Sequence, residues 1–198
     1  MSQLSQLNEE IARCRDCGLA QHRNRVVPGE GAEKAAILFI GEAPGWHEDQ
    51  QGRPFVGPAG HFLDELLASI GLSRKYFYIA NVVKCRPPSN RDPLPSEMRA
   101  CRKWLDRQIE IIKPKLIVTL GRYSLAQFFP GDVIGKVRGT ARKKQGVIYY
   151  IMYHPAAALH QQSLRRIIEE DMRKIPFLLA EAEEIEEAEP KPQQLTMF

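Results

Sequence analysis

The sequence contains no apolar run long enough to cross a membrane. Its longest uninterrupted apolar stretch without tyrosine, residues 35–40, has six residues, whereas a transmembrane helix needs about 20. The N-terminal segment MSQLSQLNEE has neither the basic start nor the apolar centre of a secretory signal. These absences predict a cytoplasmic protein with no membrane partner.

Two other common patterns are also missing. The chain has no G-x4-G-K-[ST] segment, the loop that cradles phosphates in nucleotide triphosphatases, which argues against that class of enzyme. No segment recurs at a fixed period, which argues against a solenoid. The chain is therefore expected to fold around an ordinary globular core.

Charge is distributed unevenly along the 198 residues. Residues 84–144 contain 15 Lys and Arg but 5 Asp and Glu, whereas residues 177–198 contain six Glu and one Lys. Because the whole chain carries +4, the part before this acidic segment carries +9, which favours a polyanionic partner such as nucleic acid. Scattered solvated cations would give the same count. We expect a globular domain at residues 1–178 and a disordered acidic tail at residues 179–198.

Apolar spacing predicts short strands that alternate with helices. The expected strands are residues 35–40, 77–83, 116–120 and 147–152. Helices are expected over residues 4–11, 60–70, 96–113, 123–129 and 156–179, the last interrupted near Pro176. This alternation predicts a three-layer α/β/α fold around a four-stranded, mainly parallel sheet. The ligand site of such a sheet lies at the carboxyl ends of its strands, here the loops that begin at Gly41, Asn81, Gly121 and His154.

The four cysteines form one close pair and one distant pair. Cys14 and Cys17 have C-x2-C spacing, and Cys85 and Cys101 have C-x15-C spacing. In a reducing compartment this pattern favours metal ligation over disulfides. The second pair does not have zinc-finger spacing, so spacing alone leaves zinc, an iron–sulfur cluster and no metal all open. A metal here would have an architectural role, tying the N-terminal helix to residues 85–101.

Three residues at the expected ligand edge have side chains suited to a flat base. Phe55 lies in a Gly-rich loop and offers a ring for stacking, although an apolar anchor for the loop is the alternative. Asn81 presents one acceptor and two donors, enough to pair with a pyrimidine edge, or else it caps a turn. His154, at the end of the last strand, either stabilises a developing negative charge or is structural.

These segments, taken in order, resemble the uracil-DNA glycosylase superfamily, specifically its iron–sulfur family 4. The matching pieces are GEAPGWHED at 41–49, GRPFVGPAG at 52–60, NVVKCRPPSNRDP at 81–93, both cysteine spacings, and HPA at 154–156. The resemblance covers about residues 10 to 175. Several motifs in matching order are far more specific than any one of them.

The resemblance implies a cofactor and a function. A structural 4Fe–4S cluster would be held by Cys14, Cys17, Cys85 and Cys101. The activity would be excision of uracil from single- or double-stranded DNA, which requires the nucleotide to leave the base stack first. The product would be an abasic site, the first intermediate of base-excision repair.

The resemblance also implies a role for each residue of the substrate site. Phe55 would stack on the extrahelical uracil, Asn81 would pair with its N3–H and O4, and His154 would donate a hydrogen bond to O2. The segment that includes Gly41 and Ala43 would lie against the base and the sugar.

One position departs from other branches of the superfamily. Those branches place an Asp or Asn, which positions water, where this chain has Ala43. The attacking water must therefore be held by a backbone carbonyl, by Glu42 or by Glu48. A covalent-trapping relative carries a KRRIH-like insertion with a nucleophilic histidine. No such segment occurs here, and His160 is not in its place.

Two further features suggest contacts with DNA. Basic residues lie among glycines before the last strand, in a loop or hairpin suited to gripping phosphates: Arg138, Arg142, Lys143 and Lys144. A solvated turn is the alternative. Leu159, after the HPA motif, is the best apolar candidate to wedge into the gap left by an extruded base, although a helix-packing residue would look the same.

The chain ends in an apolar pentapeptide after its Glu-rich segment. QLTMF at 194–198 resembles the peptide by which bacterial repair proteins dock on the sliding clamp. The residues that would enter the clamp pocket are Gln194, Leu195, Met197 and Phe198. A random tail is the alternative.

The sequence therefore predicts a monomeric, monofunctional uracil-DNA glycosylase. Two alternatives remain. One is a non-catalytic iron–sulfur module that recognises damaged DNA, and the other is a glycosylase acting mainly on another deaminated base such as hypoxanthine.

Overall fold

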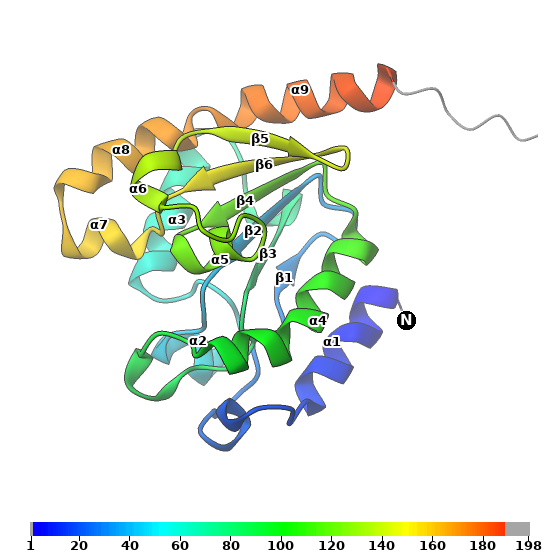
Figure 1. Ribbon diagram of the computed structural model, residues 1–198, viewed down its shortest axis with the longest axis vertical. Helices are drawn as coiled ribbons and strands as arrows, with labels where there is room; N and C mark the ends of the chain where they lie inside the picture. Colours follow the sequence, from blue (N-terminus) through cyan, green and yellow to red (C-terminus); the bar gives the residue numbers. More distant parts are fainter. Residues whose placement is uncertain (1, 189–198) are drawn as a thin grey trace, which may run out of the picture.

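A six-stranded mixed β-sheet forms the centre of the protein (Figure 1). The computed structural model describes residues 2–188. In chain order the strands are β1 (Glu30–Gly31), β2 (Ile37–Gly41), β3 (Phe77–Asn81), β4 (Leu116–Leu120), β5 (Ala141–Lys144) and β6 (Val147–Met152). Their order across the sheet is β1-β3-β2-β4-β6-β5. Neighbours pair in parallel from β3 to β6, whereas β1 and β5 are antiparallel at the two edges.

The α/β class is confirmed, but the expected strand number is wrong. Strands β1 and β5 lack the buried apolar pattern that marks a strand in sequence. Strand β1 has two residues, and β5 has the exposed, charged sequence ARKK. Charged edge strands are a common way to prevent pairing with another chain. The sheet therefore has six strands where four are expected.

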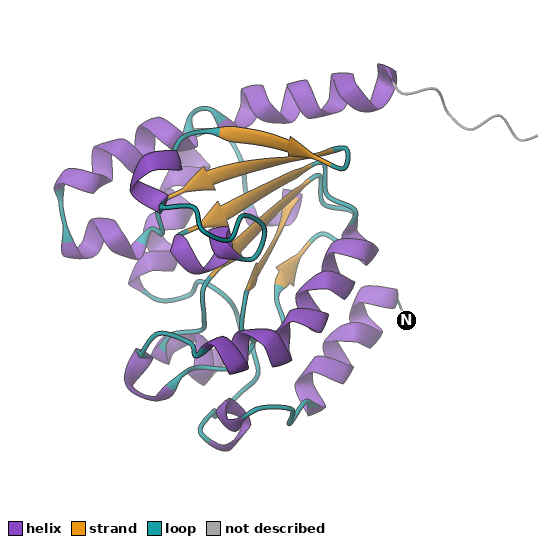
Figure 2. Ribbon diagram, viewed as in Figure 1, coloured by secondary structure: helices purple, strands orange, loops and turns teal. Residues whose placement is uncertain are grey.

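Helices cover both faces of the sheet (Figure 2). They are α1 (Gln3–Arg13), α2 (Trp46–Gln51), α3 (Pro58–Ser69), α4 (Pro95–Ile112), α5 (Arg122–Ala126), α6 (Ile134–Val137), α7 (Ala156–His160), α8 (Ser163–Met172) and α9 (Ile175–Ala188). Short 3₁₀ turns lie at Gly18–Gln21, Arg74–Tyr76 and Pro88–Asn90. The arrowheads of β4 and β6 point toward the side of the sheet where α5 and α7 begin.

The core is split by the sheet into two layers. Alternate residues of β2 take opposite sides: Phe39 packs with α3, α8 and α9, whereas Leu38 packs with α1 and α4. The central strands are fully buried on both faces, as expected for parallel strands covered by helices. This double burial fixes the strand register, and the register fixes which residues meet at the carboxyl edge.

The C-terminal helix continues beyond the expected domain boundary. Residue 178 lies inside α9, which extends to Ala188, and Ala182 is buried in the core. The expected disordered tail is therefore wrong for residues 179–188, because this apolar contact stabilises the helix in spite of its Glu-rich sequence. Residues 189–198 lie outside the described part of the chain. Within residues 2–188, no helix is long and apolar enough to cross a membrane.

Candidate active site

The carboxyl ends of the parallel strands open into a cavity of about 610 Å³. Its walls come from all four loops expected at this edge of the sheet. Of the predicted site residues, those that line it are Glu42, Ala43, Glu48, Phe55, Asn81 and His154. Strand register explains the convergence, because Gly41 of β2 pairs directly with Asn81 of β3.

Asn81 presents an unsatisfied acceptor at this edge. Its side chain is 1% exposed, and its Oδ1 atom has no hydrogen-bond partner among the described residues. A buried amide oxygen without a partner costs roughly 1–3 kcal/mol, so it is retained where a ligand supplies the donor. Gly41 makes room for this oxygen, because a Cβ atom there would lie 2.4 Å from Oδ1.

Phe55 is held in a strained backbone conformation beside His154. Its φ of 52° lies in the left-handed region, which non-glycine residues rarely adopt. Arg74 donates to the carbonyl oxygens of Pro54 and Phe55, and Gly60 leaves space for the Phe55 carbonyl. The rings of Phe55 and His154 stack with centroids 5.5 Å apart and planes 27° apart. Together these rings form an aromatic wall for a flat ligand.

His154 is a neutral hydrogen-bond donor in this setting. Its Nδ1 atom accepts a hydrogen bond from the backbone N–H of Ala156 at 3.1 Å, so the proton of the neutral ring is on Nε2. Burial lowers the pKa of His154 to about 4, although the charge of Glu48 acts in the opposite direction. At neutral pH the ring can therefore stabilise a developing anion through its Nε2–H, without itself carrying a charge.

The two candidate carboxylates have different surroundings. Glu48 accepts hydrogen bonds from the backbone N–H groups of Gly45, Val56 and Gly57 at 3.0, 2.8 and 2.8 Å. Its oxygens thus hold two loops together. Burial and the nearby Asp92 raise the pKa of Glu42 to about 7. A carboxylate with such a pKa is suited to general-base chemistry, and Glu48 is already engaged by three backbone donors, so Glu42 is the stronger candidate for activating water.

The mouth of the cavity includes residues that the sequence interpretation missed. Asp92 and Arg122 both line the cavity and form an ion pair at 2.6 Å. Tyr153 and His160 complete the wall next to α7. Asp92 lies within the motif at 81–93 and Arg122 follows the end of β4, but sequence does not reveal that they pair.

Leu159 lies beside this mouth with its side chain 51% exposed. It belongs to α7, whose residues Ala156, Ala157 and His160 line the cavity. It is therefore not a core residue, which leaves it free to contact a ligand larger than one base.

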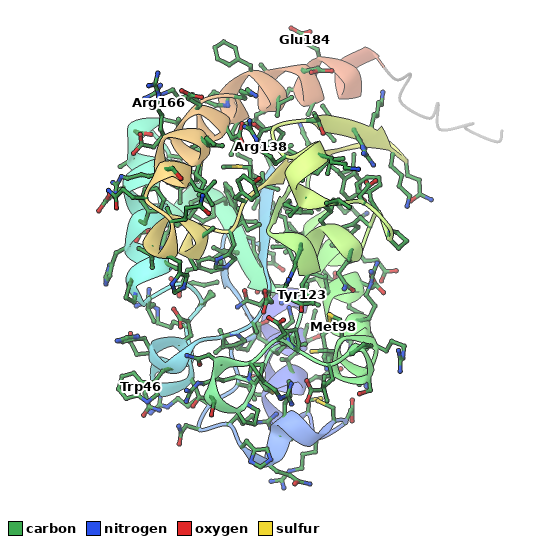
Figure 3. All side chains as sticks on the ribbon, turned by 60° about the vertical axis from the view of Figure 1, so that its left-hand side comes forward. Trp46, Met98, Tyr123, Arg138, Arg166 and Glu184 are labelled. Atoms are coloured by element: carbon green, nitrogen blue, oxygen red, sulfur yellow. The ribbon has the colours of Figure 1, made fainter. Side chains whose placement is uncertain are left out.

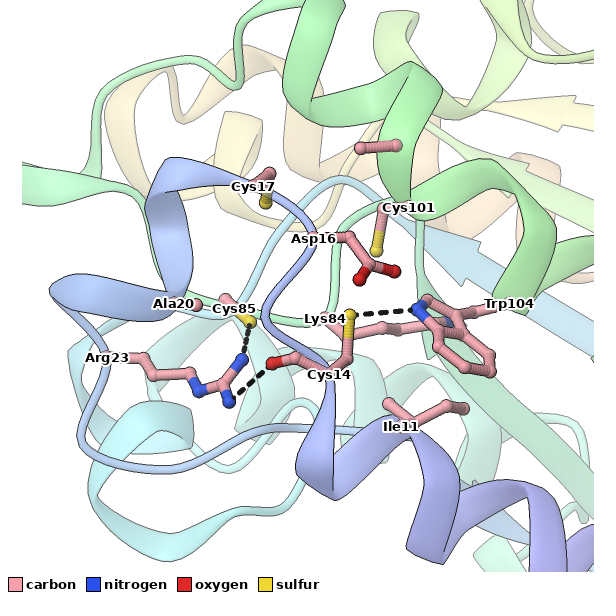
Figure 4. Close-up of a pocket in the computed structure, with 11 residues that line it drawn as sticks. Ile11, Cys14, Asp16, Cys17, Ala20, Arg23, Lys84, Cys85, Cys101 and Trp104 are labelled. Carbon is pink, nitrogen blue, oxygen red and sulfur yellow. Dashed lines mark hydrogen bonds between the residues drawn. The ribbon is translucent and has the colours of Figure 1, made fainter.

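The four cysteines line a second, smaller pocket between α1 and α4 (Figure 4). Two of their sulfurs accept hydrogen bonds: Cys85 from Arg23 at 3.1 Å, and Cys14 from the indole N–H of Trp104 at 3.3 Å. Lys84 lines the same pocket. Burial raises the pKa of the Cys85 and Cys101 thiols, whereas the positive charges of Arg23 and Lys84 act in the opposite direction and favour the thiolate, the form that binds metal.

The cysteine pocket presents four thiols as possible metal ligands. Among the described residues, no three His, Cys, Asp or Glu side chains are close enough together to hold one metal ion. The four thiols nevertheless face one pocket (Figure 4). A single zinc ion needs sulfurs at about 2.3 Å, whereas a four-iron cluster is larger and separates its ligands further. The four thiols therefore supply the donor set that a 4Fe–4S cluster requires.

Comparison with known proteins agrees with this geometry. Residues 28–177 match the family described as the Uracil DNA glycosylase superfamily. The chain is 50% identical over 185 residues to a type-4 uracil-DNA glycosylase of Sulfurisphaera tokodaii, covering 88% of this chain and 84% of that protein. It is 47% identical to one from Archaeoglobus fulgidus (88% and 92% covered) and 46% identical to one from Thermotoga maritima (85% and 90% covered).

The chain belongs to the type-4 uracil-DNA glycosylases. Membership confirms the predicted resemblance, which covers most of the chain. The family match at residues 28–177 includes every residue that lines the cavity, together with Cys85 and Cys101, whereas Cys14 and Cys17 precede it.

The basic residues predicted to contact DNA do not line the cavity of this type-4 enzyme. Arg138 pairs with Asp171, which is 1% exposed, and Arg142 pairs with Asp132. Lys143 and Lys144 lie on β5 near its turn to Val147, at the amino end of β6 and thus at the opposite edge of the sheet. In Figure 3, Arg138 lies beside α8, far from Trp46 at the other end of the molecule. Both arginines therefore have structural partners that sequence cannot reveal.

The apolar pentapeptide could not be placed. Gln194, Leu195, Met197 and Phe198 lie outside the described residues. Their assignment to a clamp pocket stays a prediction.

Proposed function

We propose that this type-4 family member is a monofunctional uracil-DNA glycosylase that flips uracil out of DNA and hydrolyses its N-glycosidic bond. The observation that carries the proposal is the unsatisfied Oδ1 atom of Asn81, next to an aromatic wall, in a chain that is up to 50% identical to named type-4 uracil-DNA glycosylases. The product is an abasic site that other repair enzymes process.

Recognition begins with the Asn81 amide. Its orphan oxygen accepts the N3–H of uracil, and its NH₂ group donates to O4. Cytosine has no hydrogen on N3 and carries an amino group in place of O4, so both contacts would be lost. Phe55 provides the stacking surface for the base. The absence of a side chain at Gly41 leaves space for the amide oxygen.

Bond cleavage is dissociative in this account. The uracil leaves as an anion while the sugar becomes oxocarbenium-like, and water then adds to the sugar. His154 donates its Nε2–H to O2 of uracil and stabilises the charge that develops there. Since the ring is already neutral, it needs no proton from solvent before reaction.

Glu42 is the proposed water-positioning residue. It lines the cavity, where Ala43 leaves no acid–base side chain, and its pKa of about 7 allows it to accept a proton from water. Glu48 has a positioning role, because its carboxylate holds the loop that carries Phe55.

Extrusion of the base is the proposed role of Leu159. Its exposed side chain beside the cavity mouth would enter the gap in the duplex and keep the uracil from returning. A weak U·G pair or single-stranded DNA lowers the energy needed for extrusion.

The four cysteines are proposed to hold a 4Fe–4S cluster with a structural role. When bound, the cluster cross-links the N-terminal helix to residues 85–101 and needs no redox step. Arg23 and Trp104 support it through their hydrogen bonds to sulfur. Iron analysis and the visible absorbance of protein purified without oxygen test this assignment.

Residues 194–198 are proposed to tether the enzyme to the sliding clamp. The enzyme is proposed to act as a monomer in the cytoplasm. Deleting residues 194–198 should abolish clamp pull-down while excision on short oligonucleotides is unchanged. Loss of both would contradict the tether, because it would indicate that the last five residues stabilise the domain.

The proposal is tested by mixing the cluster-loaded protein with a DNA strand that carries one uracil and then cutting abasic sites with alkali. Cleavage at uracil, but not at hypoxanthine, supports the proposal. Binding without cleavage would instead favour a damage-recognition module, and cleavage at hypoxanthine alone would favour the other glycosylase.

A further inference from the structure

Lys84 connects the cysteine pocket with the base-recognition residue. Its side chain is 1% exposed and lines the cysteine pocket. Its Nζ atom donates to the backbone carbonyl of Asn81 at 2.8 Å and to Oε1 of Gln108 at 2.6 Å. In Figure 4, the Lys84 side chain lies among the cysteines. One side chain thus contacts both parts of the site.

Burying this lysine is energetically costly. A buried ammonium group is destabilising unless acceptors and negative charge surround it. Two oxygens, from Asn81 and Gln108, accept hydrogen bonds from its Nζ atom, and Cys85 and Cys101 line the same pocket. If the lysine served only to fill the core, an apolar side chain of similar volume would do so without this cost.

Lys84 contacts the backbone of Asn81 at the last residue of β3. After Asn81, the backbone N–H groups of Val82 and Val83 bond to the carbonyls of Gly41 and Glu42. The Asn81 carbonyl is instead held by Lys84, three residues further along the chain. The direction of the Asn81 amide depends on this backbone, and a misplacement of about 1 Å can cost about 100-fold in rate.

We propose that Lys84 is a positioning residue for the Asn81 amide, and that the cysteines with their cluster hold Lys84 in place. Cluster occupancy then controls uracil affinity as well as the packing of α1. This inference rests on the proposed function, because it assumes that Asn81 binds uracil.

The test compares Lys84→Met with a matched control, Gln108→Leu. Both substitutions remove the Lys84–Gln108 hydrogen bond, but only Lys84→Met removes the contact with the Asn81 carbonyl. The first readout is inhibition of excision by free uracil, which reports base binding. The others are affinity for DNA with a pre-formed abasic site, iron content and the thermal midpoint.

We expect Lys84→Met to weaken inhibition by free uracil by about 10- to 100-fold, with iron content and abasic-DNA affinity unchanged. Gln108→Leu should leave inhibition by free uracil within about twofold of wild type, far less than the loss expected for Lys84→Met. Equal losses in both variants would overturn the inference, since the shared Lys84–Gln108 bond would then be responsible. Unchanged uracil inhibition in Lys84→Met would overturn it as well.

A second variant and a measurement on the unaltered protein guard against misfolding. Lys84→Gln keeps an N–H donor on a shorter side chain, so it should fold and still show weaker inhibition by free uracil. Oxidative removal of the cluster from wild type should weaken free-uracil binding while circular dichroism is unchanged. Full uracil binding after cluster loss would contradict the second half of the proposal. Absence of uracil binding and excision in wild type would instead refute the proposed function itself.

Discussion

Gly41 and Asn81 are paired at the ends of β2 and β3, so closely that a Cβ atom on Gly41 would lie 2.4 Å from Oδ1 of Asn81. A Cβ atom on Gly41 would also lie 2.6 Å from the Phe55 ring. A side chain at residue 41 must therefore displace the residues that hold the base.

Gly41→Ala should lower excision by about 100-fold, because it shifts the Asn81 amide. It should also cost about 1–3 kcal/mol of stability by overpacking. Single-turnover kinetics and urea unfolding measure the two effects. Gly18→Ala is the matched control, since a Cβ there meets nothing within 4 Å, and it should change neither. Normal excision by Gly41→Ala would show that the amide is not positioned by this contact.

The pKa of Glu42, raised to about 7 by burial, predicts the pH dependence of the reaction. A general base acts as the carboxylate, so the rate should rise with pH up to about 7 and then level off. Burial lowers the pKa of His154 to about 4, so this residue stays neutral between pH 5 and pH 9 and adds no further pH dependence to the rate. Single-turnover rates measured from pH 5 to pH 9 test this. Below the pKa of Glu42, the rate should rise by on the order of tenfold for each pH unit.

Glu42→Gln should be slow at every pH and lose this acid-side slope, because an amide cannot accept the proton. Its thermal midpoint should match that of wild type. If the slope persisted in Glu42→Gln, a different group would be titrating.

Glu48→Ala should behave differently, as a loss of stability. Three backbone N–H groups would lose their acceptor, but only that of Gly57 is buried, so the expected loss is roughly 1–3 kcal/mol. A midpoint lower by several degrees, on the order of 4–8 °C for a 2 kcal/mol loss, is expected by calorimetry. Glu48→Gln should recover part of it. A thermal midpoint equal to that of wild type, together with loss of excision, would instead make Glu48 the water-activating residue.

Arg138→Ala should lower stability more than DNA affinity. The substitution leaves the buried Asp171 carboxylate with Lys174 as its remaining cation among the described residues. Removing one partner of such a pair costs up to about 3–5 kcal/mol, and less here because Arg138 is 34% exposed. Lys143→Ala, at the exposed edge strand, is the control for unfolding. Weaker DNA binding by Arg138→Ala at an unchanged midpoint would support its predicted role in gripping phosphates.

Sequence predicted the parallel strands and the site at their ends because both depend on buried apolar runs and strong motifs. Strands 116–120 and 147–152 match β4 and β6 residue for residue. The edge strands were missed because an exposed ARKK segment has no apolar pattern. Helix α9 was missed beyond residue 178 because its stability comes from tertiary contact at Ala182.

Pair partners were the least predictable part of the site. The motif places Asn81 and His154 at one edge, but it does not reveal that Glu48 is saturated by backbone N–H groups. Nor does it reveal that Arg138 is paired with Asp171. Such pairings join residues far apart in sequence and depend on side-chain packing rather than on spacing.

The most direct test of the central claim is excision by wild type and Asn81→Ala on the same uracil-containing strand, with affinity for abasic DNA measured in parallel. We predict alkali-labile product from wild type, at least about 100-fold slower product from Asn81→Ala, and equal abasic-DNA affinity. Equal excision by both proteins, or loss of DNA affinity together with excision, would contradict the assignment of Asn81 as the residue that recognises the base.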